Sequence, residues 1–275
     1  GRDRVTGKFC PQNRKRRGEG TVQDDAGPVG PGAGLHRLHL AALVDRRVSG
    51  LPLEHVVGWA EFNGLRISVD PGVFVPRRRT GFLVAEAAAL ISASAASRSA
   101  GGVVGRPVLV DLCCGSGAVG VAVAAAVGPV ELHATDIDPA ATRCARRNVE
   151  PVGGRVYQGD LYQPLPATLR GRVDVLVANV PYVPTGAVGL LPPEARLHEP
   201  MVALDGGVDG LDVLRRVVTG AQRWLATGGH VLVETGGGQA AAAADLCAAT
   251  GLISRIACSE PMDATVVIGA VPPNR

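Results

Sequence analysis

The sequence predicts an α/β protein built on a mostly parallel sheet, with a short helix and a β-hairpin before it. From Pro107 onward, short apolar strands alternate with helices, which is typical of a parallel sheet covered on both faces. The last two strands, 253–258 and 264–270, are joined only by a short turn, so they should be antiparallel, because a parallel link needs a crossover. We therefore expect a seven-stranded sheet with an antiparallel C-terminal strand.

The elements follow from local patterns. Residues 35–48 carry apolar side chains near helical spacing, and Asn63-Gly64 is typical of a two-residue hairpin turn. An Ala-rich helix is expected over 80–94 and a small, polar linker over 92–105. The expected strands of the sheet are 108–110, 131–135, 155–158, 173–178, 230–234, 253–258 and 264–270, and the helices between them are 118–127, 139–149, 211–225 and 239–250.

Composition excludes several classes of protein. The chain has 275 residues, of which 46% are hydrophobic and only 3% aromatic, so Ala, Val and Leu must build the core. Its six cysteines form no C-x-x-C pair, which favours reduced thiols over a zinc ribbon or a disulfide scaffold. We find neither a membrane-length apolar run nor a secretory h-region, so we expect a cytoplasmic protein. Arginine far outnumbers lysine, which indicates a GC-rich, bacterial genome.

Charge and periodicity divide the chain into three segments. We expect a disordered tail over 1–34, first basic and then Gly/Pro-rich, a reduced N-terminal helix and hairpin linker over 35–80, and the domain that carries the chemistry over 81–275. Much of the net charge of +3 comes from the tail, so the body is nearly neutral and is not an obvious nucleic-acid surface.

A glycine-rich turn follows the first strand of the expected sheet. Gly115, Gly117 and Gly120 match G-x-G-x-x-G, and Asp136 ends the next strand, where a carboxylate can accept two ribose hydroxyls. Ligands of such sheets bind at the carboxyl ends of the strands. This pattern alone leaves a dinucleotide site and an S-adenosylmethionine (AdoMet) site open.

Two more carboxylates favour AdoMet. Asp111 lies directly before the glycine turn, where it would crowd a pyrophosphate but suits a ligand with a cationic amino-acid end. Asp160 follows the third strand and can accept a hydrogen bond from the exocyclic amine of an adenine. Acidic residues at the ends of three consecutive strands are the arrangement expected for AdoMet.

The segment after the fourth strand, Asn179-Val180-Pro181-Tyr182, brings in a family resemblance. With it come Gly50-Leu51-Pro52, Glu61-Phe62-Asn63-Gly64-Leu65, Phe74-Val75-Pro76-Arg77 and the stretch from His198-Glu199-Pro200 to Leu211, in an order and spacing specific to one family. Over about residues 46–270, the chain resembles the HemK-like protein-(glutamine-N5) methyltransferases, which act on the glutamine of the Gly-Gly-Gln motif in peptide-chain release factors.

The resemblance implies a Rossmann-like class I AdoMet-dependent methyltransferase that modifies a protein such as a release factor. The near-neutral body and the lack of a membrane-length apolar run favour a protein partner over nucleic acid or a membrane, and we expect a monomer. The resemblance also implies catalytic roles for Asn179, Val180, Pro181 and Tyr182, with no metal, and places Asn179, Val180, Tyr182 and Glu199 at the substrate. The implied cofactor-binding residues are Asp111, Cys113, Gly115, Gly117, Asp136, Ile137, Asp160, Leu161 and Asn179.

The chemistry of amide methylation fits these residues. An amide nitrogen is a poor nucleophile, because its lone pair is delocalised into the carbonyl. The side-chain oxygen of Asn179 and the main-chain carbonyl of Val180 can each accept one N–H of the amide, which favours the charge that builds on nitrogen in the transition state. Tyr182 can stack on the planar amide and shield it from water.

The chain departs from the family pattern at two places, and other functions stay open. Val180 replaces a proline, and the run Arg78-Arg79-Thr80-Gly81 replaces an acidic residue followed by Thr-Glu. Methylation of another protein or of an exocyclic amine in nucleic acid would use the same motif. A nicotinamide-dependent oxidoreductase would explain only the glycine turn and Asp136. A binding protein that has kept AdoMet and lost catalysis is the remaining alternative.

Overall fold

The computed structural model describes residues 31–100 and 105–273, and it divides the chain into two units, Gly1–Ala42 and Leu43–Arg275. The first unit contributes the beginning of helix α1 (Pro31–Val48), which starts at Pro31 rather than at the expected Leu35. The expectation of a disordered tail otherwise falls on residues 1–30, outside the described part of the chain. The second unit holds all the other elements.

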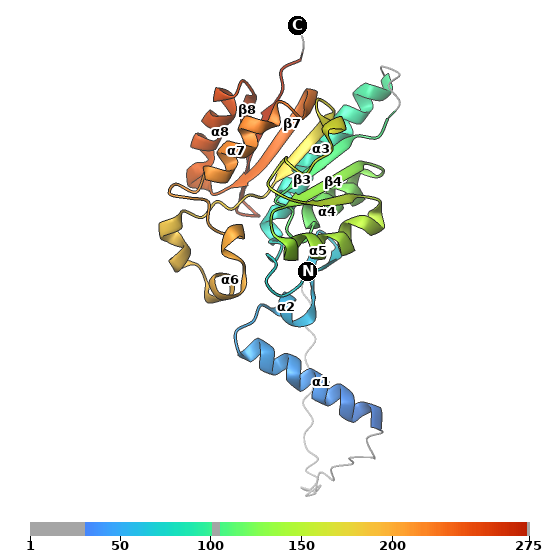
Figure 1. Cartoon of the computed structure of the whole chain (residues 1–275), viewed down its shortest axis with the longest axis vertical. Coiled ribbons are helices and arrows are strands. Elements are labelled where there is room, and N and C mark those ends of the chain that lie inside the picture. Colours follow the sequence, from blue (N-terminus) through green and yellow to red (C-terminus); the bar gives the residue numbers. More distant parts are fainter. Residues whose placement is uncertain (1–30, 101–104, 274–275) are drawn as a thin grey trace, which may run out of the picture. The chain divides into compact units, whose positions relative to one another are not determined.

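The second unit contains the expected sheet (Figure 1). It has seven strands in the order β5-β4-β3-β6-β7-β9-β8. Strand β9 pairs antiparallel with both β7 and β8, and the pairs from β5 through β7 are parallel, which confirms the predicted topology. The strands are β3 (Val108–Leu112), β4 (Glu131–Asp136), β5 (Arg155–Gln158), β6 (Val173–Ala178), β7 (Leu225–Thr235), β8 (Ile253–Ser259) and β9 (Ala264–Ala270).

Each face of the sheet packs into its own hydrophobic core. Successive side chains of a strand point to opposite faces, so Val108, Val110 and Leu112 enter one core and Leu109 enters the other. Helices α3 (Gly81–Ala100), α4 (Ala118–Val127) and α5 (Pro139–Val149) cover the Leu109 face. Helices α7 (Asp212–Ala221) and α8 (Ala240–Ala249) cover the opposite face. Both faces are therefore buried, as the continuous apolar strands predict.

The predicted hairpin is also confirmed. Strands β1 (Trp59–Phe62) and β2 (Leu65–Ser68) pair antiparallel, and the turn residues Asn63 and Gly64 have φ values of 50° and 77°, as a type I′ turn requires. A short helix, α2 (Leu53–Val57), precedes the hairpin. The expected linker is partly wrong, because α3 continues to Ala100. Its last turns are rich in alanine and contain neither Gly nor Pro, so nothing in them stops the helix.

Two further differences concern the segments around β6 and β7. After β6 the chain forms elements that were not predicted, namely helix α6 (Pro193–His198) and the flanking 3-10 turns η4 (Thr185–Leu190) and η5 (Met201–Ala203). Strand β7 begins at Leu225, earlier than expected, with an irregular register against β6. Within residues 31–100 and 105–273, no helix combines the length and the apolarity needed to cross a bilayer.

Candidate active site

A cavity of about 570 Å³ opens at the carboxyl ends of β3, β4, β5 and β6, a volume that suits a cofactor together with part of a substrate. The segment 74–80 and the α6 region form its other walls. Of the predicted site residues, it is lined by Asp111, Cys113, Gly115, Asp136, Ile137, Asp160, Leu161, Asn179, Val180, Pro181 and Tyr182.

The glycine turn between β3 and α4 is built around left-handed backbone. Gly115 and Gly117 have φ values of 56° and 77°, and Cys113, at 54°, adopts the same region without being glycine. Leu161, which also lines the cavity, has a φ of 48°. Strained non-glycine residues cluster at functional sites, and here two of them line one cavity.

Gly117 has a packing role instead of facing the cavity. A Cβ atom at this position would lie 2.6 Å from Cγ2 of Val149 in α5, so only glycine lets the turn approach that helix. The main chain of Gly115 donates a hydrogen bond of 2.8 Å to Oδ2 of Asp136, which ties the turn to the end of β4. Of the two predicted glycines, Gly115 lines the cavity and Gly117 does not.

Asp111 lies at the bottom of the cavity and is 1% exposed. Its Oδ2 accepts a hydrogen bond of 2.9 Å from the main-chain N–H of Gly120, in the first turn of α4. Burial raises the pKa of Asp111 to about 7, and the nearby carboxylate of Asp136 acts in the same direction. An uncompensated buried carboxylate facing a cavity suits a ligand that brings a positive charge.

The other two strand-end carboxylates lie along the same wall. Burial raises the pKa of Asp136, although its side chain also accepts the main-chain N–H groups of Gly115 and Asp138. Asp160 is paired with Arg216 of α7, which also lines the cavity and which no sequence pattern singled out. Ile137, 52% exposed beside Asp136, offers an apolar surface to a ring.

Two buried hydroxyl groups test whether this cavity fits AdoMet. Thr80 and Thr135 are at most 1% exposed, both line the cavity, and their Oγ1 atoms have no hydrogen-bond partner within the structure. Buried polar atoms normally have partners, so these two are accounted for by a polar ligand. Together with the carboxylates at the ends of three strands, they fit a nucleoside that carries a charged amino-acid end.

Asn179, Val180, Pro181 and Tyr182 follow β6 directly and lie on the cavity wall next to the glycine turn. In the described part of the chain, no hydrogen bond reaches the side chain of half-buried Asn179, so its amide is available to a substrate. The side chain of Val180 is 2% exposed and packs into the α7–α8 core. This packing explains how valine can replace a proline here, because the main-chain carbonyl stays in place.

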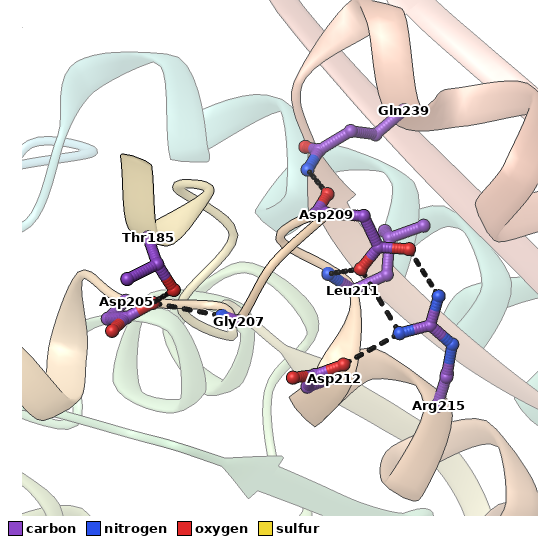
Figure 2. Close-up of polar contacts among 8 residues, drawn as sticks. All are labelled: Thr185, Asp205, Gly207, Asp209, Leu211, Asp212, Arg215 and Gln239. Carbon is purple, nitrogen blue, oxygen red and sulfur yellow. Dashed lines mark hydrogen bonds and ion pairs between the residues drawn. The ribbon is translucent and has the colours of Figure 1, made fainter. Parts of the chain in front are cut away.

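A loop over residues 204–212 pairs with the segment that follows this motif, and Figure 2 shows the polar contacts of Asp205, Asp209 and Asp212 in that loop. Its main chain pairs with the 183–185 segment through Val183 N–H to Leu204 O (3.1 Å), Gly206 N–H to Val183 O (2.9 Å) and Thr185 N–H to Gly207 O (2.9 Å). Asp205 accepts hydrogen bonds from the Thr185 hydroxyl (2.7 Å) and the Gly207 N–H (2.9 Å). We call residues 204–212 the clamp, because they pair with residues 183–185, directly after the Asn179–Tyr182 motif.

Gln239 joins this clamp to the motif. Its Nε2 donates to the main-chain carbonyls of Tyr182 (3.0 Å) and Asp209 (2.9 Å), while its Oε1 accepts from Gly236 N–H (3.3 Å). Sequence reasoning missed Gln239, although Gly237-Gly238-Gln239 repeats within this chain the Gly-Gly-Gln tripeptide of the release factors.

Glu199 was expected to contact the substrate, but in the structure it does not line the cavity. It is 6% exposed and accepts hydrogen bonds from Val75 N–H (3.1 Å) and from the guanidinium of Arg77 (2.5 Å). Arg77 does line the cavity. Glu199 therefore positions Arg77 at the cavity through this hydrogen bond. A sequence pattern cannot distinguish that role from direct contact with the substrate.

Comparisons with known proteins agree with this geometry. The methyltransferase small domain family matches residues 88–190. The release factor glutamine methyltransferase of Geobacter sulfurreducens is 36% identical over 229 residues, which cover 82% of this chain and 75% of that protein. The 4-amino-L-phenylalanine/4-methylamino-L-phenylalanine methyltransferase of Streptomyces pristinaespiralis is 37% identical over 226 residues, 82% of this chain and 73% of that protein. A crystal structure of a Pyrococcus furiosus methyltransferase shares the fold, with a TM-score of 0.54 at 14% identity, covering 87% of this chain and 99% of that one.

Fold and cavity together define a class I AdoMet-dependent methyltransferase with a Rossmann-like core. Within that class, the extent and identity of the match to its relatives decide the family. The chain belongs to the release factor glutamine methyltransferase family.

Proposed function

We propose that the protein methylates the side-chain amide nitrogen of a glutamine in a cytoplasmic protein, namely the Gly-Gly-Gln glutamine of a peptide-chain release factor. The observation that carries the proposal is the unpartnered amide of Asn179, next to the free carbonyl of Val180, on the wall of a cavity that fits AdoMet. Relatives over most of the chain are named for this activity.

The residues of the motif orient the acceptor. The Oδ1 atom of Asn179 accepts one N–H of the acceptor amide, and the carbonyl oxygen of Val180 accepts the other. When bound, AdoMet supplies an electrophilic methyl group on a sulfonium. Asp111, Asp136 and Asp160 hold the polar groups of that cofactor, and the ring of Tyr182 covers the planar amide and excludes water. Holding nitrogen and methyl in line removes several kcal/mol from the barrier, as expected for oriented reactants.

The test is methyl transfer from labelled AdoMet to release factors of the same cell, with the Gly-Gly-Gln glutamine present or replaced. Label that requires this glutamine supports the proposal, and label on a different protein assigns another target. Bound AdoMet with no transfer to any acceptor favours a protein that only binds the cofactor. The enzyme alone is an essential control, because its own residues 237–239 contain the same tripeptide.

A second candidate is methylation of an aryl amine on a free amino acid. The Streptomyces pristinaespiralis relative, named for such a substrate, matches as much of this chain as the Geobacter protein does. An aryl amine is also a planar, conjugated nitrogen that Asn179 and Val180 could orient. Adding 4-amino-L-phenylalanine to the same assay distinguishes the two candidates. If the protein acts on a release factor, this amino acid should neither be methylated nor compete with the protein acceptor.

A further inference from the structure

Arg79 makes contacts in the cavity that the family pattern does not anticipate, since an acidic residue was expected near this place. It lies in the 3-10 turn η1 (Arg78–Thr80), and its guanidinium bridges two elements far apart in sequence. Its Nε lies 3.2 Å from Oε1 of Glu234, and its Nη2 donates to the hydroxyl of Tyr182. The guanidinium carbon lies 5.8 Å from the centre of the Tyr182 ring.

Glu234 completes this cluster from the end of β7. It is 2% exposed, and its Oε1 accepts from Arg79 and, at 3.5 Å, from the hydroxyl of Tyr182. Its Oε2 is buried without a hydrogen-bond partner in the described structure. A buried carboxylate with so few partners needs a nearby cation to stabilise it. The guanidinium of Arg79 is the cation that contacts Glu234.

We propose that Arg79 is a positioning residue that acts through Tyr182. Its N–H donates to the phenol oxygen, while the phenol O–H points to Glu234, so the hydroxyl end of the ring is fixed in direction. The main-chain carbonyl of the same residue is fixed by Gln239 at 3.0 Å. Tyr182 is thus held at both ends, and its ring is a rigid wall beside Asn179.

This arrangement also specifies the chemistry of the acceptor. Because Glu234 and the hydroxyl of Tyr182 both engage the guanidinium, the charge of Arg79 is already paired, and the ring of Tyr182 offers an aromatic face to the acceptor. A neutral, planar acceptor such as a glutamine amide fits this wall, and an anionic group gains nothing from it. The proposal therefore rests on the proposed function and narrows it to neutral acceptors.

The first test needs no acceptor, so its outcome is independent of the proposed function. Fluorotyrosine incorporated into the full chain gives one ¹⁹F resonance for each of the three tyrosines, and Tyr182→Phe assigns the one at the site. Arg79→Ala is expected to shift that resonance and leave the others, whereas the matched control Arg78→Ala, an exposed neighbour outside the cavity, leaves all three. An unmoved Tyr182 resonance in Arg79→Ala would overturn the proposal.

The second test is a double-mutant cycle in the methyl-transfer assay. Arg79→Ala is expected to lower kcat about tenfold and to leave the KM for AdoMet unchanged, but to cost less than about twofold in a Tyr182→Phe background. Arg79→Lys should recover only part of the loss, because lysine lacks the planar fork.

Equal losses in both backgrounds would mean that Arg79 does not act through the hydroxyl. If Arg79→Ala lowered methyl transfer to an anionic acceptor more than to a neutral one, the proposed class of neutral acceptors would be wrong. If the wild type methylates no acceptor, the proposed function fails and the resonance experiment still decides the role of Arg79.

Discussion

The side-chain amide of Gln239 donates a 3.0 Å hydrogen bond to the main-chain carbonyl of Tyr182, across 57 residues of sequence. Its second amide proton goes to the carbonyl of Asp209 at 2.9 Å. One side chain from the 3-10 turn η6 (Gly237–Gln239), which follows β7, thus connects the proposed catalytic motif to the clamp, and Figure 2 shows its contact with Asp209.

Replacing Gln239 by Glu should lower both stability and methyl transfer. The change removes both donors and brings a carboxylate against two carbonyl oxygens, so we expect a loss of about 1–3 kcal/mol in the free energy of unfolding. We also expect a fall in kcat. Chemical denaturation and the transfer assay measure the two effects. Gln222→Glu is the matched control, because that amide donates to a single exposed carbonyl, of Thr250, away from the cavity. Equal effects of the two changes would refute the role given to Gln239.

Gly206→Ala should reduce activity by displacing the clamp. A Cβ atom there would lie 2.6 Å from the carbonyl oxygen of Pro181 and 2.7 Å from that of Gly210, and neither main-chain atom can yield easily. We expect a lower kcat and a lower melting temperature, read from the transfer assay and a thermal melt. Gly189→Ala, in η4, is the control, because a Cβ at that position meets nothing within 4 Å. An active, stable Gly206→Ala variant would show that the clamp does not set the geometry of the motif.

Asn179→Ala should abolish most of the methyl transfer. Losing a preorganised hydrogen-bonding group aimed at developing charge typically costs about a hundredfold in kcat. The side chain has no partner among the described residues, so the fold should tolerate its truncation. Calorimetric titration with AdoMet checks that the cofactor site survives. A variant that keeps wild-type kcat would remove Asn179 from the mechanism.

AdoMet affinity should depend on pH through Asp111. Burial raises the pKa of this carboxyl from 3.8 to about 7, and only its ionised form attracts the ammonium of the cofactor. Affinity should therefore fall as pH drops below about 7, by up to about tenfold per pH unit. Calorimetric titrations from pH 5.5 to about 8.5 measure this slope. Asp111→Asn should flatten it, and a wild-type affinity that is constant with pH would contradict the assignment.

The same group gives the cofactor-free protein an opposite dependence. With a folded pKa above the unfolded one, Asp111 keeps its proton in the fold while the unfolded chain has released it. Stability therefore falls as pH rises from about 4 to about 7, and Asp111→Asn should raise the melting temperature at pH 8 without AdoMet. Asp174→Asn is the control: it removes another buried carboxylate that accepts a main-chain N–H, from Val108, and lies outside the cavity.

Sequence alone predicted most of this architecture, because buried parallel strands appear as continuous apolar runs. The early start of β7 was missed, since Thr227-Gly228-Gly229 resembles a turn although the chain continues in the sheet. The strand-end carboxylates were found because the topology of a parallel sheet places them together. The contact between Arg79 and Glu234 was not predicted, because the two residues meet across 155 residues and no local pattern encodes their contact. Glu199 was assigned to the substrate because a sequence motif does not reveal which way a side chain faces, and in the structure it contacts Val75 and Arg77.

The fold distinguishes the enzyme's own tripeptide, Gly237-Gly238-Gln239, from the same tripeptide in a release factor. The folded chain engages both amide protons of Gln239 with its own main chain, so this glutamine offers no free N–H to Asn179 or Val180 of another copy. In a release factor the same tripeptide must be exposed to act as an acceptor. Methylated Gln239 would therefore indicate that a molecule had unfolded, and native enzyme is expected to carry Gln239 without a methyl group.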